Sequence, residues 1–156
     1  METRIKKIIK KELKAKVEKI EKITEGFSHE NYLVKLNKKP REVVIRFSNK
    51  IIPDATLLKE KFVLDLLRKN SLPTPKVYAF YFPKENKNGG YMILEKIDGI
   101  RLDLLWNDLS NQEKIKLTEK MGRLLKDIHK ISFDEFGMIL EDGSIDSVKG
   151  YRFKGS

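Results

Sequence analysis

The sequence predicts an α+β protein in which one helix crosses a five-stranded antiparallel sheet and the first helices of a helical lobe follow. Three observations lead to this prediction. Helix-like and strand-like segments occur in the order helix, three strands, helix, two strands and then helices. Short, turn-rich connections join consecutive strand-like segments, which indicates antiparallel neighbours. The period of the apolar residues changes from helical to alternating and back along the chain.

The N-terminal segment predicts an amphipathic helix, because its apolar residues recur at helical spacing: Ile5, Ile8, Ile9 and Leu13. Three strand-like runs follow, at VEKIEKITEG, where a strand approaches a turn, at NYLVKL and at REVVIRF, and the turn NKKP separates the last two. In REVVIRF both faces are partly apolar, so this strand is expected to be central in the sheet.

After Pro53 the period becomes helical, with Asp54 as the expected N-cap of a helix that ends near Asn70. The segment SLPTP stops this helix because proline cannot continue it. The runs VYAFYF and YMILEKI then predict a hairpin of two strands, joined by the turn-rich PKENKNGG.

A short helix is expected within residues 100–108, and Ser110 with Glu113 forms a capping box for a longer helix to about His129. An apolar stripe runs along this longer helix: Leu117, Met121, Leu124, Leu125 and Ile128. From Phe133 onward clear periodicity is lost, and two short apolar pieces are either strand-like or a docked loop.

Composition limits the class of protein. The chain has 156 residues, no cysteine, and no apolar run near the ~20 residues that a membrane helix needs, so we expect a cytoplasmic protein with no membrane partner. The formal net charge is +10, and residues 1–22 carry nine Lys or Arg and four Glu, which is half of that charge. A basic nucleic-acid-binding module is the alternative, but residues 1–22 hold no aromatic side chain for base stacking, so we expect no nucleic-acid partner.

Arg46 is the residue that most needs an explanation, because it lies among apolar residues in the middle of a strand. On the following helix, Glu60 lies three residues after Leu57 and four before Leu64, which places it on the side that faces the sheet. A carboxylate on a buried helical face needs a cation. We therefore predict that Arg46 and Glu60 form an ion pair.

These segments resemble, in order, the aminoglycoside phosphotransferase and choline kinase-like enzymes, which are small-molecule kinases with a protein-kinase-like fold. ITEGFSHENYLV looks like the glycine-containing nucleotide loop of this family, and VVIRF looks like its third strand, where Arg or Lys meets phosphate. LLKEKFVLDLLRKNSLPTPKVY resembles its ion-pairing helix, YMILEKIDG its hinge strand, and GRLLKDIHKISFDEFG its Leu-His helix end.

The resemblance implies a nucleotide-binding site with ATP and Mg²⁺ as cofactors. It assigns Gly26, Ser28 and Arg46 to the phosphates, with Glu60 as the ion-pair partner of Arg46. Backbone groups of Glu95 and Ile97 are assigned to adenine, with Val34 and Val44 as apolar walls. For the side chain of Glu95, a surface ion pair with a neighbouring lysine is the alternative. The acceptor is expected to be a small-molecule alcohol that binds to the helical lobe.

Two features depart from the family pattern. His29 stands where the family commonly has Asn, and the catalytic loop with His-Gly-Asp, its downstream Asn and the later metal-binding Asp have no counterpart here. The expected organisation is therefore a nucleotide-binding kinase-like lobe at 1–97, followed by the hinge and a truncated helical lobe at 98–156. No catalytic residue and no Mg²⁺ ligand is predicted in this chain, and a non-catalytic kinase-like scaffold remains an alternative.

Overall fold

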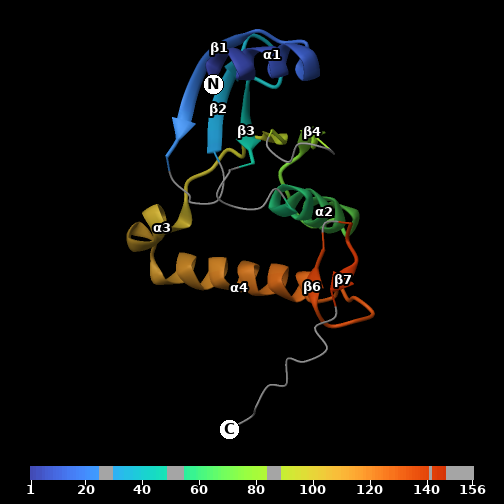
Figure 1. The fold of residues 1–156 in the computed structure, drawn as a ribbon. Helices are drawn as coiled ribbons and strands as arrows, with labels where there is room; N and C mark the ends of the chain where they lie inside the picture. Colours follow the sequence, from blue (N-terminus) through green and yellow to red (C-terminus); the bar gives the residue numbers. More distant parts are fainter. Residues whose placement is uncertain (25–29, 49–54, 84–88, 141, 147–156) are drawn as a thin grey trace.

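A five-stranded antiparallel sheet organises the computed structural model, which describes residues 1–24, 30–48, 55–83, 89–140 and 142–146 (Figure 1). The strand order is β1-β2-β3-β5-β4, so β3 is central. This confirms the predicted fold class. The strands are β1 (Val17–Ile23), β2 (Glu30–Leu36), β3 (Glu42–Phe47), β4 (Val77–Tyr81) and β5 (Tyr91–Glu95).

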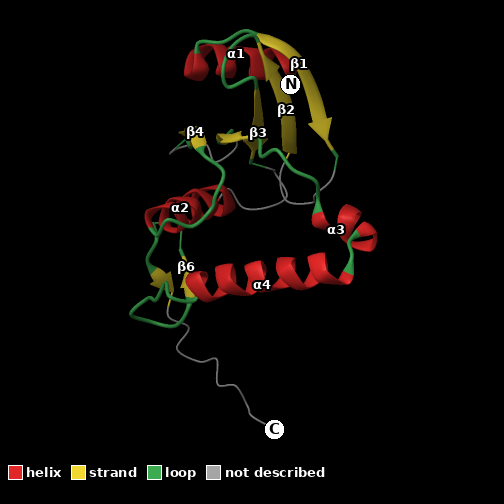
Figure 2. Cartoon of the chain, turned by 180° about the vertical axis from the view of Figure 1, so that it is seen from behind, coloured by secondary structure: helices red, strands yellow, loops and turns green. Residues whose placement is uncertain are grey.

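The helices lie on both sides of this sheet and below it in Figure 1. Seen from behind, α2 (Ala55–Lys69) lies between the sheet and α4 (Asn111–Ile128) (Figure 2). The two apolar pieces near the C-terminal end pair as a short antiparallel hairpin, so the strand-like alternative holds there. The elements are α1 (Glu2–Leu13), α2 (Ala55–Lys69), α3 (Leu102–Leu105), the 3₁₀ helix η1 (Trp106–Asp108), α4 (Asn111–Ile128), β6 (Met138–Ile139) and β7 (Ile145–Asp146).

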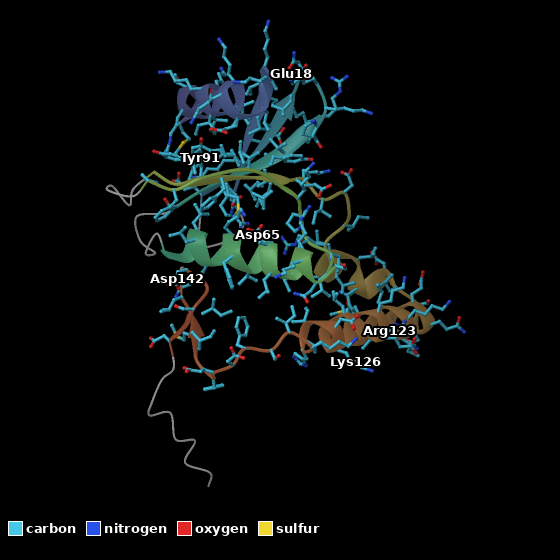
Figure 3. All side chains as sticks on the ribbon, turned by 90° about the vertical axis from the view of Figure 1, so that its right-hand side faces the viewer. Glu18, Asp65, Tyr91, Arg123, Lys126 and Asp142 are labelled. Atoms are coloured by element: carbon cyan, nitrogen blue, oxygen red, sulfur yellow. The ribbon has the colours of Figure 1, made fainter. Side chains whose placement is uncertain are left out.

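The main core lies between α1 and one face of the sheet. The predicted stripe of α1 is confirmed, since Ile5 and Ile9 are fully buried against β2 and β3. Val43, Ile45 and Phe47 alternate along β3 and all point into this core, because successive strand residues face opposite sides. Figure 3 shows α1 and α2 on opposite sides of the sheet.

The second core is smaller and lies under α2. Leu57 of α2 is fully buried with Met92 and Leu94 of β5, and Val44 and Leu64 pack at its edge. The helix therefore covers the side of the sheet that carries Arg46. It ends before Ser71, which has a positive φ of 59°, and Pro73 lies two residues further on.

The capping box of α4 is confirmed. The Ser110 side chain accepts a hydrogen bond from the Glu113 backbone N–H, and the Glu113 carboxylate accepts one from the Ser110 backbone N–H at 2.9 Å. No residue of α4 is buried, and three residues of its predicted apolar stripe are exposed, Met121 at 54%, Leu124 at 37% and Leu125 at 52%, whereas Leu117 and Ile128 are partly buried. Within the described residues, no helix has both the length and the apolar character to cross a membrane.

A hydrogen bond from a tyrosine on β5 links the sheet to α1. The Tyr91 hydroxyl donates a hydrogen bond to Glu12 Oε1 at 2.7 Å. This bond holds the pKa of Glu12 below its ordinary value of 4.5, and burial raises the pKa of Tyr91. We expect Tyr91→Phe to lower the free energy of unfolding by about 1 kcal/mol at pH 7, because the bond is lost while the ring stays.

The depressed pKa of Glu12 sets the pH dependence of this effect. The ionised Glu12 carboxylate contributes its full stabilisation above pH 4.5, the ordinary pKa. This stabilisation is lost as the pH falls through the lower pKa that Glu12 has in the folded state. Urea unfolding at pH 7 and near pH 3 measures it, and the difference between Tyr91→Phe and the unmodified chain should shrink at the lower pH. Tyr81→Phe, which makes the same chemical change on the stacked neighbouring ring, is the control. A difference that is equal at both pH values would contradict the assignment.

Candidate functional site

Arg46 lies on the central strand, on the face that points away from α1. The residues of β3 on this face are Glu42, Val44 and Arg46, and each is partly buried. In the strand register, Arg46 lies between Asn31 of β2 and Met92 of β5. Its side chain therefore begins in the middle of the sheet, under α2.

Among the residues that the structure describes, two polar groups hold the Arg46 guanidinium. Its Nη1 forms an ion pair with Glu60 Oε1 of α2, and its Nε donates a hydrogen bond to Asn31 Oδ1 at 2.9 Å. The side chains of Arg46 and Glu60 are each 26% exposed, and burial lowers the pKa of Arg46 from its ordinary 12.5. The guanidinium stays charged at neutral pH and carries five donors.

The structure thus brings Arg46 and Glu60 together, as the sequence predicted. Helical spacing is the reason, because Leu57 and Leu64 take part in the core under α2 and Glu60 lies between them on the same side. Each member of the pair offsets part of the desolvation of the other.

Beside Arg46 lies an apolar patch formed by Leu33, Val44 and Leu94, one residue from each of three neighbouring strands. Val44 pairs with both Leu33 and Leu94 in the register, so all three share the Arg46 face. The expectation that Val34 forms a wall of the same site is wrong. Val34 belongs to the fully buried core under α1, on the opposite face, because side chains alternate along β2.

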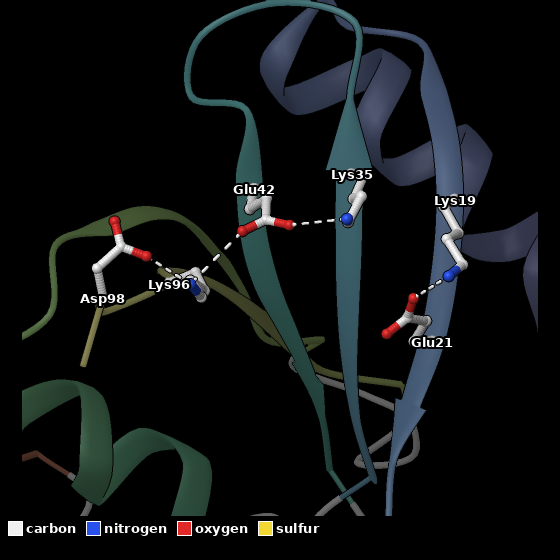
Figure 4. Close-up of polar contacts among 6 residues, drawn as sticks. All are labelled: Lys19, Glu21, Lys35, Glu42, Lys96 and Asp98. Atoms are coloured by element: carbon white, nitrogen blue, oxygen red, sulfur yellow. Dashed lines mark hydrogen bonds and ion pairs between the residues drawn. The ribbon is translucent and has the colours of Figure 1, made fainter. Parts of the chain in front are cut away.

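A charged network continues along the same face beyond the apolar patch (Figure 4). Glu42 lies 3.5 Å from Lys35 Nζ through one carboxylate oxygen and 3.5 Å from Lys96 Nζ through the other. Lys96 also pairs with Asp98, and this hydrogen bond is the main reason that the pKa of Lys96 is raised. A separate pair, Lys19 with Glu21, lies on β1. The face therefore runs from a cation at Arg46 through apolar residues to a charge-neutralised edge.

The predicted hinge residues lie at the end of β5 and just beyond it. The Glu95 backbone N–H donates to the Lys76 carbonyl at 2.8 Å, and the Glu95 carboxylate accepts from the Lys76 backbone N–H at 2.9 Å. Glu95 thus ties the end of β5 to the residue before β4, and in the described part of the chain no lysine side chain forms the ion pair considered as its alternative. Ile97 is 64% exposed, just beyond the strand.

Two of the predicted phosphate-contacting residues, Gly26 and Ser28, lie outside the described residues, as does the expected N-cap Asp54. Among the residues that the structure does describe, no group of three or more His, Cys, Asp or Glu side chains could hold a metal ion.

Asn31 is the site residue that the sequence reasoning missed. The signal was present, because the turn NKKP at residues 37–40 sets the hairpin register. Once Leu36 is placed next to Arg41, counting five residues away from the turn along each strand places Asn31 opposite Arg46. An amide at this position orients the guanidinium from the side that Glu60 does not reach.

The sheet order, the crossing helix α2 and the Arg46–Glu60 pair together define an α+β protein with the arrangement expected of a kinase-like N-terminal lobe. The model of the phosphotransferase enzyme family matches residues 19–142, which is well over half of the chain. The chain therefore belongs to the phosphotransferase enzyme family, and the resemblance noted from its motifs is confirmed. The match begins within β1 and so does not include α1.

One solved structure and no curated protein match the chain in the other comparisons. The structure is that of a Haemophilus somnus 129PT protein with the provisional name fructosamine-3-kinase. The sequences are 19% identical and the TM-score is 0.45, with 62% of this chain covered. The chain covers 32% of the length of that protein.

Proposed function

We propose that this chain is the nucleotide-binding part of an ATP-dependent phosphotransferase, which transfers a phosphoryl group from ATP to a hydroxyl group of a small molecule. The observation that carries the proposal is the half-buried Arg46 on the central strand, held by Glu60 and Asn31 beside an apolar patch. Membership of the phosphotransferase enzyme family supports it.

The residues of this face fit a nucleotide. A partly desolvated cation binds phosphate oxygens more strongly than an exposed one, and Glu60 with Asn31 keeps the guanidinium in one orientation. Val44 precedes Arg46 by two residues on the same strand face, so the two side chains begin about 7 Å apart. A nucleotide carries its base and its phosphates on either side of a ribose. We assign the base to Val44 and Leu33 and the phosphates to Arg46.

The remaining assignments follow the family resemblance. Gly26 and Ser28 are assigned to the phosphates, and backbone groups at Glu95 and Ile97 are assigned to adenine. Mg²⁺, when bound with ATP, neutralises charge on the phosphates. We place its ligands, the catalytic loop and the site for the small-molecule acceptor in the helical lobe, outside the residues of this chain.

The proposal is tested by calorimetric titration of the chain with a non-hydrolysable ATP analogue and Mg²⁺. We expect Arg46→Ala to weaken binding about 10- to 100-fold, the value of one charge-assisted hydrogen bond. Arg46→Lys should recover part of the affinity, because it keeps the charge but not the paired contacts to Glu60 and Asn31. Arg123→Ala is the matched control, since Arg123 pairs with Glu119 on exposed α4. Circular dichroism establishes that each variant is folded.

Absence of binding by the unmodified chain, or equal binding by the unmodified chain and Arg46→Ala, would contradict the nucleotide site. The isolated chain is further expected to transfer no phosphate to any acceptor. Measurable kinase turnover would contradict the placement of the catalytic loop outside these residues.

A further inference from the structure

The exposed side of α1 carries a basic groove that the proposed phosphotransferase site does not use. Two cavities of about 480 and 660 Å³ adjoin there and share Lys7 and Lys11. We call this surface the α1 groove and define it by its cations Arg4, Lys7, Lys10, Lys11, Lys14 and Lys16. It lies on the opposite side of the sheet from Arg46, and most of it precedes the residues that match the family.

The charge in this groove is predominantly positive. Residues 1–16 contain seven Lys or Arg and two Glu. Of these two, Glu12 is engaged by the Tyr91 hydroxyl and lies 3.2 Å from Lys11 Nζ. Glu2 lies at the other end of the helix, 4.0 Å from Lys6 Nζ. The excess of cations therefore faces solvent along the groove.

An aromatic side chain also lines the groove, although it is far from these lysines in the sequence. Tyr81 of β4 is 46% exposed and stacks on Tyr91 of β5, with ring centroids 5.4 Å apart and planes at 29°. Tyr91 is 5% exposed and its hydroxyl is bound, so it supports Tyr81 rigidly from beneath. Lys11 Nζ lies 5.5 Å from the Tyr81 ring centroid. The Tyr81 ring is thus partly exposed beside cations, and a base that stacks on it would meet the Lys11 ammonium there.

Arg4 is held in position at the same end of the groove. Its Nη2 donates to the Gly89 carbonyl at 2.6 Å, and its guanidinium lies 4.5 Å from the centroid of the buried Phe47 ring. A cation that is already ordered loses little side-chain entropy when it binds an anion.

The length of the groove favours a polymer over a single nucleotide. Arg4, Lys7 and Lys11 recur at one helical turn and span about 10 Å along α1, and Lys14 follows directly after the helix. That distance matches several consecutive phosphates of one strand. A cationic groove that follows the backbone, with an exposed aromatic ring for the bases, is how single-stranded nucleic acid is bound without sequence preference. A duplex keeps its base faces stacked inside and cannot use the ring.

We propose that the α1 groove binds single-stranded nucleic acid, with phosphates on the cations of α1 and a base stacked on Tyr81. The expectation of no nucleic-acid partner rested on the absence of aromatic residues in residues 1–22. The fold removes that objection, because β4 and β5 bring two tyrosines to the helix.

Fluorescence anisotropy of a labelled ten-residue oligo-dT tests the proposal on the full chain. Affinity should fall with rising salt, with a log–log slope of about −3 for four phosphate contacts. Tyr81→Ala should weaken binding about 5- to 100-fold, and Tyr81→Phe should keep it. The double change Lys7→Glu with Lys10→Glu should weaken binding more than Lys116→Glu with Lys120→Glu, which alters net charge equally on exposed α4. A thermal melt checks that each variant is folded.

The proposal is overturned if Tyr81→Ala binds as tightly as the unmodified chain, or if the two double variants lose affinity equally. It is also overturned if duplex DNA of the same length, inorganic polyphosphate or a free nucleotide competes as well as the oligonucleotide. The same holds if the chain binds only vesicles with anionic lipid. Arg46→Ala should leave oligonucleotide binding unchanged, so the result is independent of the nucleotide site on the other face.

Discussion

Replacing Glu60 by alanine is expected to lower the free energy of unfolding by about 2 kcal/mol. The change leaves Arg46 charged beneath α2, with Asn31 as its remaining described partner at 2.9 Å. A fully buried pair that loses one member costs about 3–5 kcal/mol, whereas an exposed pair contributes about 0–1 kcal/mol. The 26% exposure of both side chains places this pair between those limits.

The pair of Lys61 with Asp65 on the same helix gives a matched control. Asp65 is 57% exposed, and the pair has the i,i+4 spacing of a surface interaction. Asp65→Ala should therefore change stability by less than about 0.5 kcal/mol. Urea unfolding followed by circular dichroism measures both variants. If Glu60→Ala shifts the unfolding midpoint no more than Asp65→Ala does, the pair does not stabilise the sheet under α2.

Truncation of Phe47 to alanine is expected to have the largest effect on stability, about 3–5 kcal/mol. The Phe47 ring is 2% exposed and fills the core between β3 and α1. It meets Tyr32 and Tyr91 edge to face at 6.1 and 6.4 Å, and Arg4 covers it at 4.5 Å. The alanine variant loses the buried apolar area and these three ring contacts together.

Phe136→Ala makes the same chemical change at a residue that is 79% exposed, and it should alter stability by less than about 0.5 kcal/mol. Phe47→Leu keeps most of the volume and should recover more than half of the loss. Chemical unfolding of the three variants measures this order. Equal stability of Phe47→Ala and Phe136→Ala would show that the core between α1 and the sheet is not formed as described.

The parts of the fold that could be predicted from the sequence are those that local patterns determine. Apolar residues on both faces of REVVIRF identified a central strand, and the spacing of Ser110 and Glu113 identified the cap of α4. The Arg46–Glu60 pair was predictable because an isolated charge and a carboxylate on a sheet-facing helical position each require a partner. The position of Asn31 opposite Arg46 was equally predictable, because the hairpin register determines it.

The parts that could not be predicted depend on which helix covers which face. Both faces of β2 carry apolar residues, Val34 on one and Leu33 on the other, so alternation alone does not assign them. The position of α1 decides, since it buries Val34 and leaves Leu33 beside Val44. The contact between Lys11 and Tyr81 could not be predicted from the sequence either, because the two residues are far apart in the chain and only the sheet brings them together.

The exposure of α4 has a consequence for how the chain opens. A helix with no buried residue has little tertiary packing to hold it, and its cap and surface pairs contribute little on their own. Its amide protons should therefore exchange with solvent through local opening, far faster than those of β3, which has a paired strand on each side. The chain is thus expected to have a slowly exchanging sheet and a rapidly exchanging helical end, and a binding partner that covers α4 would reveal itself by slowing exchange there alone.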